Sequence, residues 1–213
     1  MLEVLEGKHS LEKSLLGGLL IGFCCVYAGT IQGEFIKSII ISLGFLSTLE
    51  LKFPVFTLVS GEARIMTTFL GYPSPDVIMY RILIRKVLFG NILGLLLAGL
   101  CGIYLLPPDI ITANVVDPSW GNVIVSSIVA GILINLGVSG YSESSNLRWI
   151  AVFPIFIVCT LGLSHSIVDL IPIMISTVLG DLSVLKGLGV LGLTILGNFF
   201  GTRVRTLIIK KDD

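Results

Sequence analysis

Charged residues are scarce in this chain. Asp, Glu, Lys and Arg make up 13% of its 213 residues, whereas apolar residues make up 54%. A soluble domain carries about 25% charged residues, so the composition argues against a soluble protein. It indicates an all-α integral membrane protein with several spanning helices.

A net charge is also missing, because 14 basic residues balance 14 acidic ones. The chain therefore lacks the positive surface on which nucleic-acid binding depends. It has no HExxH motif, no paired carboxylates and no Ser/His pair at helical spacing, which argues against an enzyme. Four cysteines lie in apolar segments without metal-ligand spacing and are interpreted as small buried side chains: Cys24, Cys25, Cys101 and Cys159. We expect neither a metal nor a cofactor.

Six segments are apolar and long enough to cross a bilayer, which takes about 20 residues. They are residues 14–32, 35–60, 87–106, 121–140, 149–179 and 185–208. The second and fifth are too long for one simple crossing, and each contains polar residues and a proline. We expect these two helices to be broken inside the membrane.

The basic residues predict the orientation, because cytoplasmic loops carry an excess of Lys and Arg. With the N-terminus in the cytoplasm, eleven of the fourteen basic residues fall on the cytoplasmic side, and only Lys37 and Lys186 fall outside. Lys52 is the remaining one and lies within the second span. We therefore expect a multi-pass protein of the cell membrane with both termini in the cytoplasm.

Two stretches interrupt the broken spans: LELKFPVF (49–56) and LGLSHSIVDLIP (161–172). Their polar, charged and helix-breaking residues are Glu50, Lys52, Pro54, Ser164, His165, Ser166 and Asp169. Non-helical backbone at membrane depth is tolerated only where protein buries it or where it lines a watery cavity. An ionisable side chain there is costly and points to function. We expect both groups to converge on a central pathway near the bilayer midplane.

The ionisable side chains among these residues also have structural interpretations. Glu50 can form a salt bridge with a neighbouring helix, and Lys52 can reach a membrane interface or pair with Asp169. Asp169 can instead cap the half-helix that follows it. A lone histidine in an apolar helix is usually a core residue, but His165 stands at a break between two serines, which favours a functional role.

A short motif recurs in the third and sixth spans. LFGNILG (88–94) and ILGNFFG (195–201) share the pattern apolar-x-Gly-Asn-x-x-Gly. The central residues of the motif are Gly90, Asn91, Gly197 and Asn198. Taken alone, each motif is typical of helix packing, with small residues and an amide hydrogen bond.

The positions of the motifs indicate an internal repeat. Each Gly-Asn span follows a broken span, so the order plain, broken, Gly-Asn occurs twice, over residues 14–106 and 121–208. Three spans per half place the two halves in opposite orientations. This is the pattern of an inverted repeat, within a single transmembrane channel domain over 1–213.

Several stretches resemble the formate/nitrite transporter family. GLSHSIVDLIPI (162–173) is similar to the span-five signature of that family, Gly-x-x-His-Ser-x-x-Asn. GILINLGVSG (131–140), with Asn135, resembles its span-four pattern, and SLGFLSTLEL (42–51) resembles its approach to the span-two break. ILGNFFG resembles its terminal Leu-Gly-Asn-x-x-Gly. The order and spacing hold along nearly the whole chain.

The resemblance implies an aquaporin-like fold of six spans in two inverted repeats, usually in a homopentamer with one pore per protomer. It implies passage of small monovalent anions of weak acids, such as formate, nitrite or hydrosulfide, alone or with a proton. The family's central histidine corresponds to His165 and its span-four asparagine to Asn135. The chain departs from the family at Lys52-Phe53, where the family usually has Phe-Thr, and at Asp169, where it has Asn.

The sequence therefore favours an anion channel or transporter. The candidate pathway residues are Glu50, Lys52, Phe53, Asn135, Ser164, His165, Ser166 and Asp169. A bare anion pays a large desolvation cost in a dry constriction, and a histidine can supply the proton that lets it cross as the neutral acid. Lys52 would draw anions in, unless Asp169 cancels its charge. The alternatives are a channel for another small solute, with selectivity set by Lys52, and a non-transporting membrane scaffold.

Overall fold

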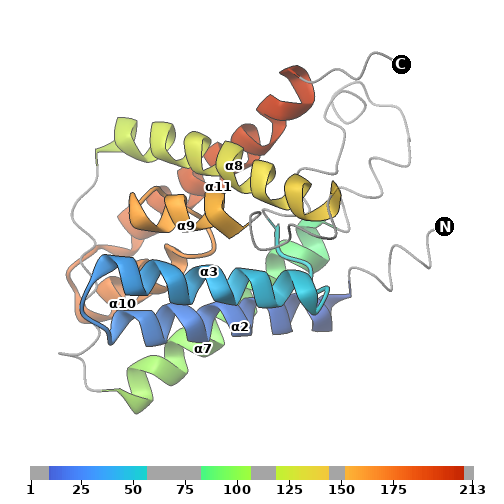
Figure 1. Cartoon of the computed structure of the whole chain (residues 1–213). Coiled ribbons are helices and arrows are strands. Elements are labelled where there is room, and N and C mark those ends of the chain that lie inside the picture. Colours follow the sequence, from blue (N-terminus) through green and yellow to red (C-terminus); the bar gives the residue numbers. More distant parts are fainter. Residues whose placement is uncertain (1–9, 57–82, 107–118, 144–151, 209–213) are drawn as a thin grey trace.

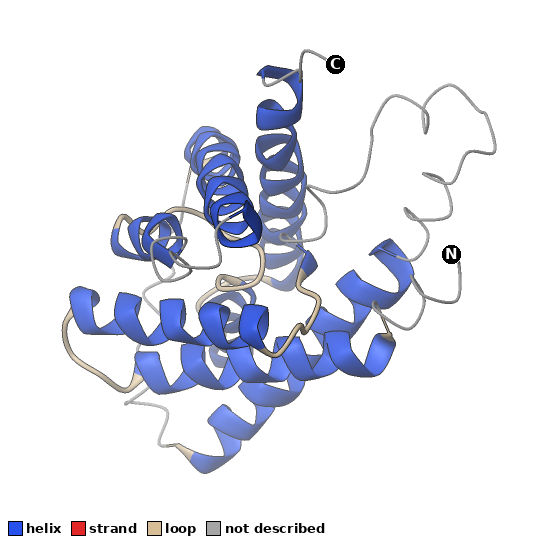
Figure 2. Cartoon of the chain, turned by 45° about the vertical axis from the view of Figure 1, so that its right-hand side comes forward, coloured by secondary structure: helices blue, strands red, loops and turns tan. Residues whose placement is uncertain are grey.

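The computed structural model describes residues 10–56, 83–106, 119–143 and 152–208, and every regular element among them is helical (Figures 1 and 2). The elements are α2 (Leu11–Gly29), α3 (Glu34–Glu50), the π-helical turn η1 (Leu83–Leu88), α7 (Phe89–Leu105), α8 (Trp120–Glu143), α9 (Val152–Thr160), α10 (Leu170–Leu179) and α11 (Val184–Ile208). The all-α prediction is confirmed for this part of the chain.

Four of the described helices are long and apolar enough to cross a membrane. The candidate spans are Leu11–Gly29, Lys86–Leu105, Trp120–Val138 and Val184–Val204. They coincide with the first, third, fourth and sixth spans that the sequence predicts.

Helices end inside the second and fifth predicted spans. α3 ends at Glu50 and is followed by a non-helical stretch over 51–55; most of the second half of this span lies outside the described residues. α9 ends at Thr160 and α10 begins at Leu170, with residues 161–169 non-helical between them. The fifth span is therefore broken as predicted, and in the second span the described helix ends at Glu50. Residues 51–56 and 161–169 are called the first and second segments below.

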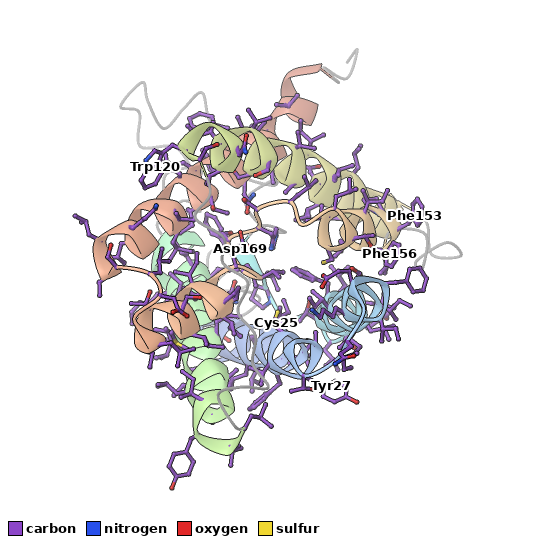
Figure 3. All side chains as sticks on the ribbon, turned by 90° about the vertical axis from the view of Figure 1, so that its left-hand side faces the viewer. Cys25, Tyr27, Trp120, Phe153, Phe156 and Asp169 are labelled. Atoms are coloured by element: carbon purple, nitrogen blue, oxygen red, sulfur yellow. The ribbon has the colours of Figure 1, made fainter. Side chains whose placement is uncertain are left out.

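Two helix pairs form the frame of the molecule. α2 packs along α7, and α8 packs along α11, more extensively than any other pair of described helices. α3 bridges the two halves, because it packs against both α2 and α9. Seen end-on, the helices are arranged in a ring, with the second segment on its inner side (Figure 3). The core is apolar and includes Ile21, Phe45, Leu95, Ile134 and Ile167.

Glycines let the paired helices meet backbone to backbone. A Cβ atom at Gly18 of α2 would collide with the backbone of Asn91 in α7. A Cβ atom at Gly131 of α8 would collide in the same way with the backbone of Asn198 in α11. Close packing of small residues replaces the hydrophobic driving force that helices lack inside lipid. The two helix pairs are thus built on the same contact.

Asn91 ties the first segment to two helices. Its amide nitrogen donates to the carbonyl oxygens of Ser14 in α2 (2.6 Å) and of Pro54 (3.0 Å). Its amide oxygen accepts from the backbone N–H of Phe56 (2.7 Å). Asn91 is fully buried, so one side chain satisfies three buried main-chain groups that would otherwise be costly.

Asn198 does the same for the second segment. Its amide nitrogen donates to the carbonyl oxygens of Ser127 in α8 (2.8 Å) and of Ser164 (3.1 Å), and its amide oxygen accepts from the N–H of Ser166 (2.8 Å). In both segments the bonded carbonyl and N–H belong to residues two positions apart. These contacts agree with the interpretation of the Gly-Asn motifs as packing sites with an amide hydrogen bond.

We expect Gly18→Ala and Gly131→Ala to destabilise the protein, because the added methyl group forces apart two helices in backbone contact. Overpacking of this kind costs about 1–3 kcal/mol, and thermal unfolding in detergent measures the loss. Gly192→Ala in α11 is the matched control, since a Cβ atom there meets nothing within 4 Å and alanine favours a helix by about 1 kcal/mol. Equal melting temperatures for the three variants would contradict the described contacts.

Asn91→Ala and Asn198→Ala should each be more damaging, because three main-chain groups lose their bonds at once. Each buried group left unpaired costs about 1–3 kcal/mol, so we expect a large fall in melting temperature and in the yield of monodisperse protein. Asn122→Ala, on the exposed start of α8, serves as the control. If the two buried variants melt with the wild type, the segments are held by other contacts.

Candidate functional site

The first segment begins with a defined helix end. After α3, the N–H of Lys52 donates to the carbonyl of Leu49 (3.1 Å), and the N–H of Phe53 donates to that of Thr48 (2.9 Å). Lys52 has a left-handed backbone, with φ of 56°. These two bonds around a left-handed residue form a Schellman motif, in which glycine is the usual occupant.

The second segment begins in the same way. After α9, the N–H of Gly162 donates to the carbonyl of Cys159 (3.2 Å), and the N–H of Leu163 donates to that of Val158 (3.0 Å). Gly162 has a φ of 60°. The position that glycine fills here is filled by Lys52 in the first segment, where a side chain costs about 1–2 kcal/mol. Lys52 is the only non-glycine residue with positive φ in the described part of the chain.

The charged residues of the first segment are not joined to those of the second. Glu50 and Lys52 are exposed at the end of α3. The pair between Lys52 and Asp169, one of the alternatives that the sequence left open, does not form, and Lys52 makes no ion pair with any described residue. The carboxylate of Asp169 binds a backbone N–H instead, that of His165.

Beyond these helix ends both segments turn into the protein. In the first segment residues 54–56 are buried and Phe53 is half-buried. In the second, His165 and Ser166 are buried. The first segment therefore places apolar side chains and a proline at depth, whereas the second places an imidazole and a hydroxyl there. The chemistry of the candidate site lies in the second segment.

His165 is held through its backbone and its ring. Its N–H donates to Oδ2 of Asp169 (3.0 Å), and its Nδ1 accepts from the N–H of Val168 (3.4 Å). The ring of Phe45 in α3 packs edge-on against the imidazole, with centroids 5.3 Å apart and planes at 77°. The residue is 1% exposed, so its orientation is set by neighbours on every side.

These contacts leave one ring atom available. A ring nitrogen that accepts an N–H carries no proton, so the proton of the neutral ring lies on Nε2. Nε2 is buried, and no described residue accepts a hydrogen bond from it. The buried hydroxyl of Ser166 is likewise without a partner among the described residues. A buried donor left unpaired costs about 1–3 kcal/mol, which an acceptor bound at this place would recover.

Ser164 holds the second segment against α8. The hydroxyl of Ser126 in α8 donates to Oγ of Ser164 (2.9 Å), and the Ser164 carbonyl is one of the two that Asn198 binds. The side chains of Ser164 and Ser126 are half-buried. Ser164 therefore helps to fix the place of the next residue, His165.

Asp169 stands at the N-cap position of α10, but its side chain makes no capping hydrogen bond. The interpretation of Asp169 as a side-chain cap is therefore wrong. Its carboxylate reaches back four residues to the N–H of His165. Figure 3 places Asp169 and Cys25 of α2 on the inner side of the helix ring. The side chain of Asp169 is half-buried, so it is hydrogen-bonded to the backbone and still partly accessible.

Asn135 links α8 to α11. Its amide nitrogen donates to the carbonyl oxygen of Thr202, and its side chain is half-buried. This bond gives Asn135 a role in packing the second helix pair, in addition to the pathway role that the resemblance implies.

The sequence analysis did not identify the face of α3 that packs against His165. Phe45 supplies the ring against His165, and Ser42, one turn earlier on the same face of α3, has a buried hydroxyl without a partner among the described residues. The hydroxyl of Ser176 in α10 is also buried without a hydrogen-bond partner among the described residues. The signal was the spacing of Ser38, Ser42 and Phe45, which marks one buried face of α3.

The chemistry available here is hydrogen-bond donation in a buried setting. The donors are the Nε2–H of His165 and the hydroxyl of Ser166, beside an aromatic edge. In the described ranges, no three His, Cys, Asp or Glu side chains come together to hold a metal ion. The arrangement suits a small acceptor or anion, which takes up donors that protein groups do not use.

Comparison with known families identifies the chain. The family model described as Formate/nitrite transporter matches residues 6–210. The comparison with curated proteins gave no match. The match covers nearly the whole chain and agrees with the four long apolar helices. The chain is therefore a multi-pass membrane protein that belongs to the formate/nitrite transporter family.

Proposed function

We propose that this chain conducts small monovalent anions of weak acids, such as formate, nitrite or hydrosulfide, across the cell membrane past His165. The observation that carries the proposal is the buried Nε2–H of His165, which no described residue accepts and which lies one residue from the equally unpaired hydroxyl of Ser166. Family membership supports the class of solute. The role is transport, with no enzymatic step.

The two donors can replace part of the hydration that an anion loses on entering the site. An anion that enters a dry constriction loses its hydration, and hydrogen bonds to a charged acceptor are about twice as strong as neutral ones. An imidazole also exchanges protons near physiological pH. His165 can thus bind the solute and let it pass the constriction as the neutral acid, with the Phe45 ring keeping the imidazole in place.

We propose an aquaporin-like architecture for the single transmembrane domain of residues 1–213. It consists of two inverted three-helix repeats, over about 14–106 and 121–208. The matching bonds of Asn91 and Asn198, and the matching helix ends at Lys52 and Gly162, support this reading.

The proposal also covers the orientation of the domain in the membrane and its oligomeric state. The excess of Lys and Arg on one side supports cytoplasmic termini. The family to which the chain belongs supports a homopentamer with one pathway per protomer. Exposed apolar side chains such as Tyr27, Phe35 and Leu185 are suited to contact lipid or a neighbouring protomer.

Lys52 has a supporting role in this proposal. A left-handed helix end favours glycine, as at Gly162, so the presence of a lysine at this strained position points to a use for its side chain. Its exposed ammonium adds positive potential at the end of α3, and such a potential raises the local concentration of anions.

A second candidate is a channel for a small neutral solute. The observation that favours it is the apolar first segment, which carries no buried polar side chain among residues 53–56. The flux assay below separates this candidate from the first, and from a scaffold that transports nothing.

We expect His165→Asn and His165→Ala to fold but to lose at least about tenfold in formate uptake by proteoliposomes. The loss corresponds to one hydrogen bond to a charged acceptor, about 1.5–3 kcal/mol. Nitrite, hydrosulfide and a small neutral solute are tested in parallel. His9→Asn is the matched control, because His9 is the other histidine in the sequence.

The outcomes separate the candidate functions. Uptake of the weak acids that depends on His165 supports the proposal. Uptake of the neutral solute alone supports the second candidate. If folded and inserted wild-type protein takes up none of the solutes, the result supports a non-transporting membrane scaffold.

Lys52→Asn removes the charge and keeps a residue that tolerates the left-handed backbone. We expect formate uptake to fall several-fold at low ionic strength and the difference to shrink at high salt, because exposed charges act through a screened field. Lys52→Gly should show the same fall and melt at a higher temperature, since glycine relieves the backbone strain. Unchanged uptake at low salt in both variants would show that the charge of Lys52 has no role in transport.

A further inference from the structure

The hydroxyl of Ser42 in α3 differs from the other hydroxyls of that helix. Ser38 and Ser47 each donate to the carbonyl oxygen four residues earlier (2.7 and 2.8 Å), and Thr48 donates to the carbonyl of Phe45 (2.7 Å). A hydroxyl inside a helix usually makes such a bond or points to solvent. Ser42 does neither, because the residue is 3% exposed and its Oγ has no hydrogen-bond partner among the described residues.

Ser42 lies on the side of α3 that carries the contact with the candidate site. It precedes Phe45 by three residues, so the two side chains share one face of the helix, about 4.5 Å apart along its axis. Both belong to the buried residues of α3, and the Phe45 ring packs against the imidazole of His165. The hydroxyl is therefore placed about one helical turn from the ring that packs against His165.

Ser42 adds a donor from the other half of the chain. His165 and Ser166 supply their donors from the second segment, whereas Ser42 belongs to α3. A hydroxyl donates one hydrogen bond and carries no charge, so it can hold an anion without the strong attraction of a fixed cation. Conduction requires sites that bind well enough to admit the solute and weakly enough to release it. A buried hydroxyl beside the histidine meets this requirement.

We propose that Ser42 is a second binding position for the transported anion, one turn of α3 away from the position at His165 and Ser166. The inference rests on the proposed function and adds to it a residue outside the second segment. The ligand is a small monovalent anion with an oxygen acceptor, such as formate or nitrite, because an oxygen lone pair is the partner that a hydroxyl donor takes.

The second position is tested by the concentration dependence of formate uptake into proteoliposomes. Ser42→Ala removes the hydroxyl and leaves the helix intact, since alanine is the best helix former. We expect the variant to need at least fivefold more formate for half-maximal uptake, because one donor to the anion is lost. Its melting temperature in detergent should equal or exceed that of the wild type, because the removed hydroxyl has no described bond to lose.

Ser38→Ala is the matched control, because Ser38 lies on the same buried face of α3 and its hydroxyl is already bonded to the Glu34 carbonyl; its uptake should match the wild type. Wild-type concentration dependence in Ser42→Ala would overturn the second position while leaving transport past His165 intact. Weaker uptake accompanied by a lower melting temperature, or the same loss in Ser38→Ala, would show a structural role and overturn it as well. Absence of formate uptake by the folded wild-type protein would overturn the proposed function, and the second position with it.

Discussion

The interaction on which the structure depends is the bond between an asparagine amide and the backbone of an interrupted helix. A bilayer offers no water to the N–H and C=O groups that a helix break sets free. Asn91 and Asn198 each supply a donor and an acceptor from one buried side chain. A carboxylate would only accept and a lysine would only donate. The same residues also lie where Gly18 and Gly131 let the paired helices touch, so the break and the helix pair are stabilised together.

The sequence predicts this frame well because its signals are local. The breaks are marked by Pro54 and by polar residues in apolar runs, and the supports by a Gly-Asn motif that occurs twice. The partners are less predictable. That Asp169 binds the N–H of His165 rather than capping α10 depends on how residues 161–169 fold back, and no spacing rule reports this. The ring of Phe45 reaches the histidine from another helix, which a single sequence does not indicate.

Lys52 illustrates the same limit in another way. Its position two residues before a proline suggested a charge in the pathway that either attracts anions or pairs with Asp169. The backbone explains the position differently, because Lys52 is the left-handed residue that ends α3, where its side chain is exposed. A helix end of this kind is usually recognised by its glycine, and Gly162 carries that signal whereas Lys52 does not.

The two segments share their framework and differ in their chemistry. With the same helix ends and the same amide supports, one buries Phe56 where the other buries Ser166. In the second segment His165 and Asp169 are coupled, because the backbone N–H of His165 donates a hydrogen bond to the carboxylate of Asp169. Asp169 therefore fixes the backbone of the residue whose ring carries the buried donor, so the position of the donor depends on this acid.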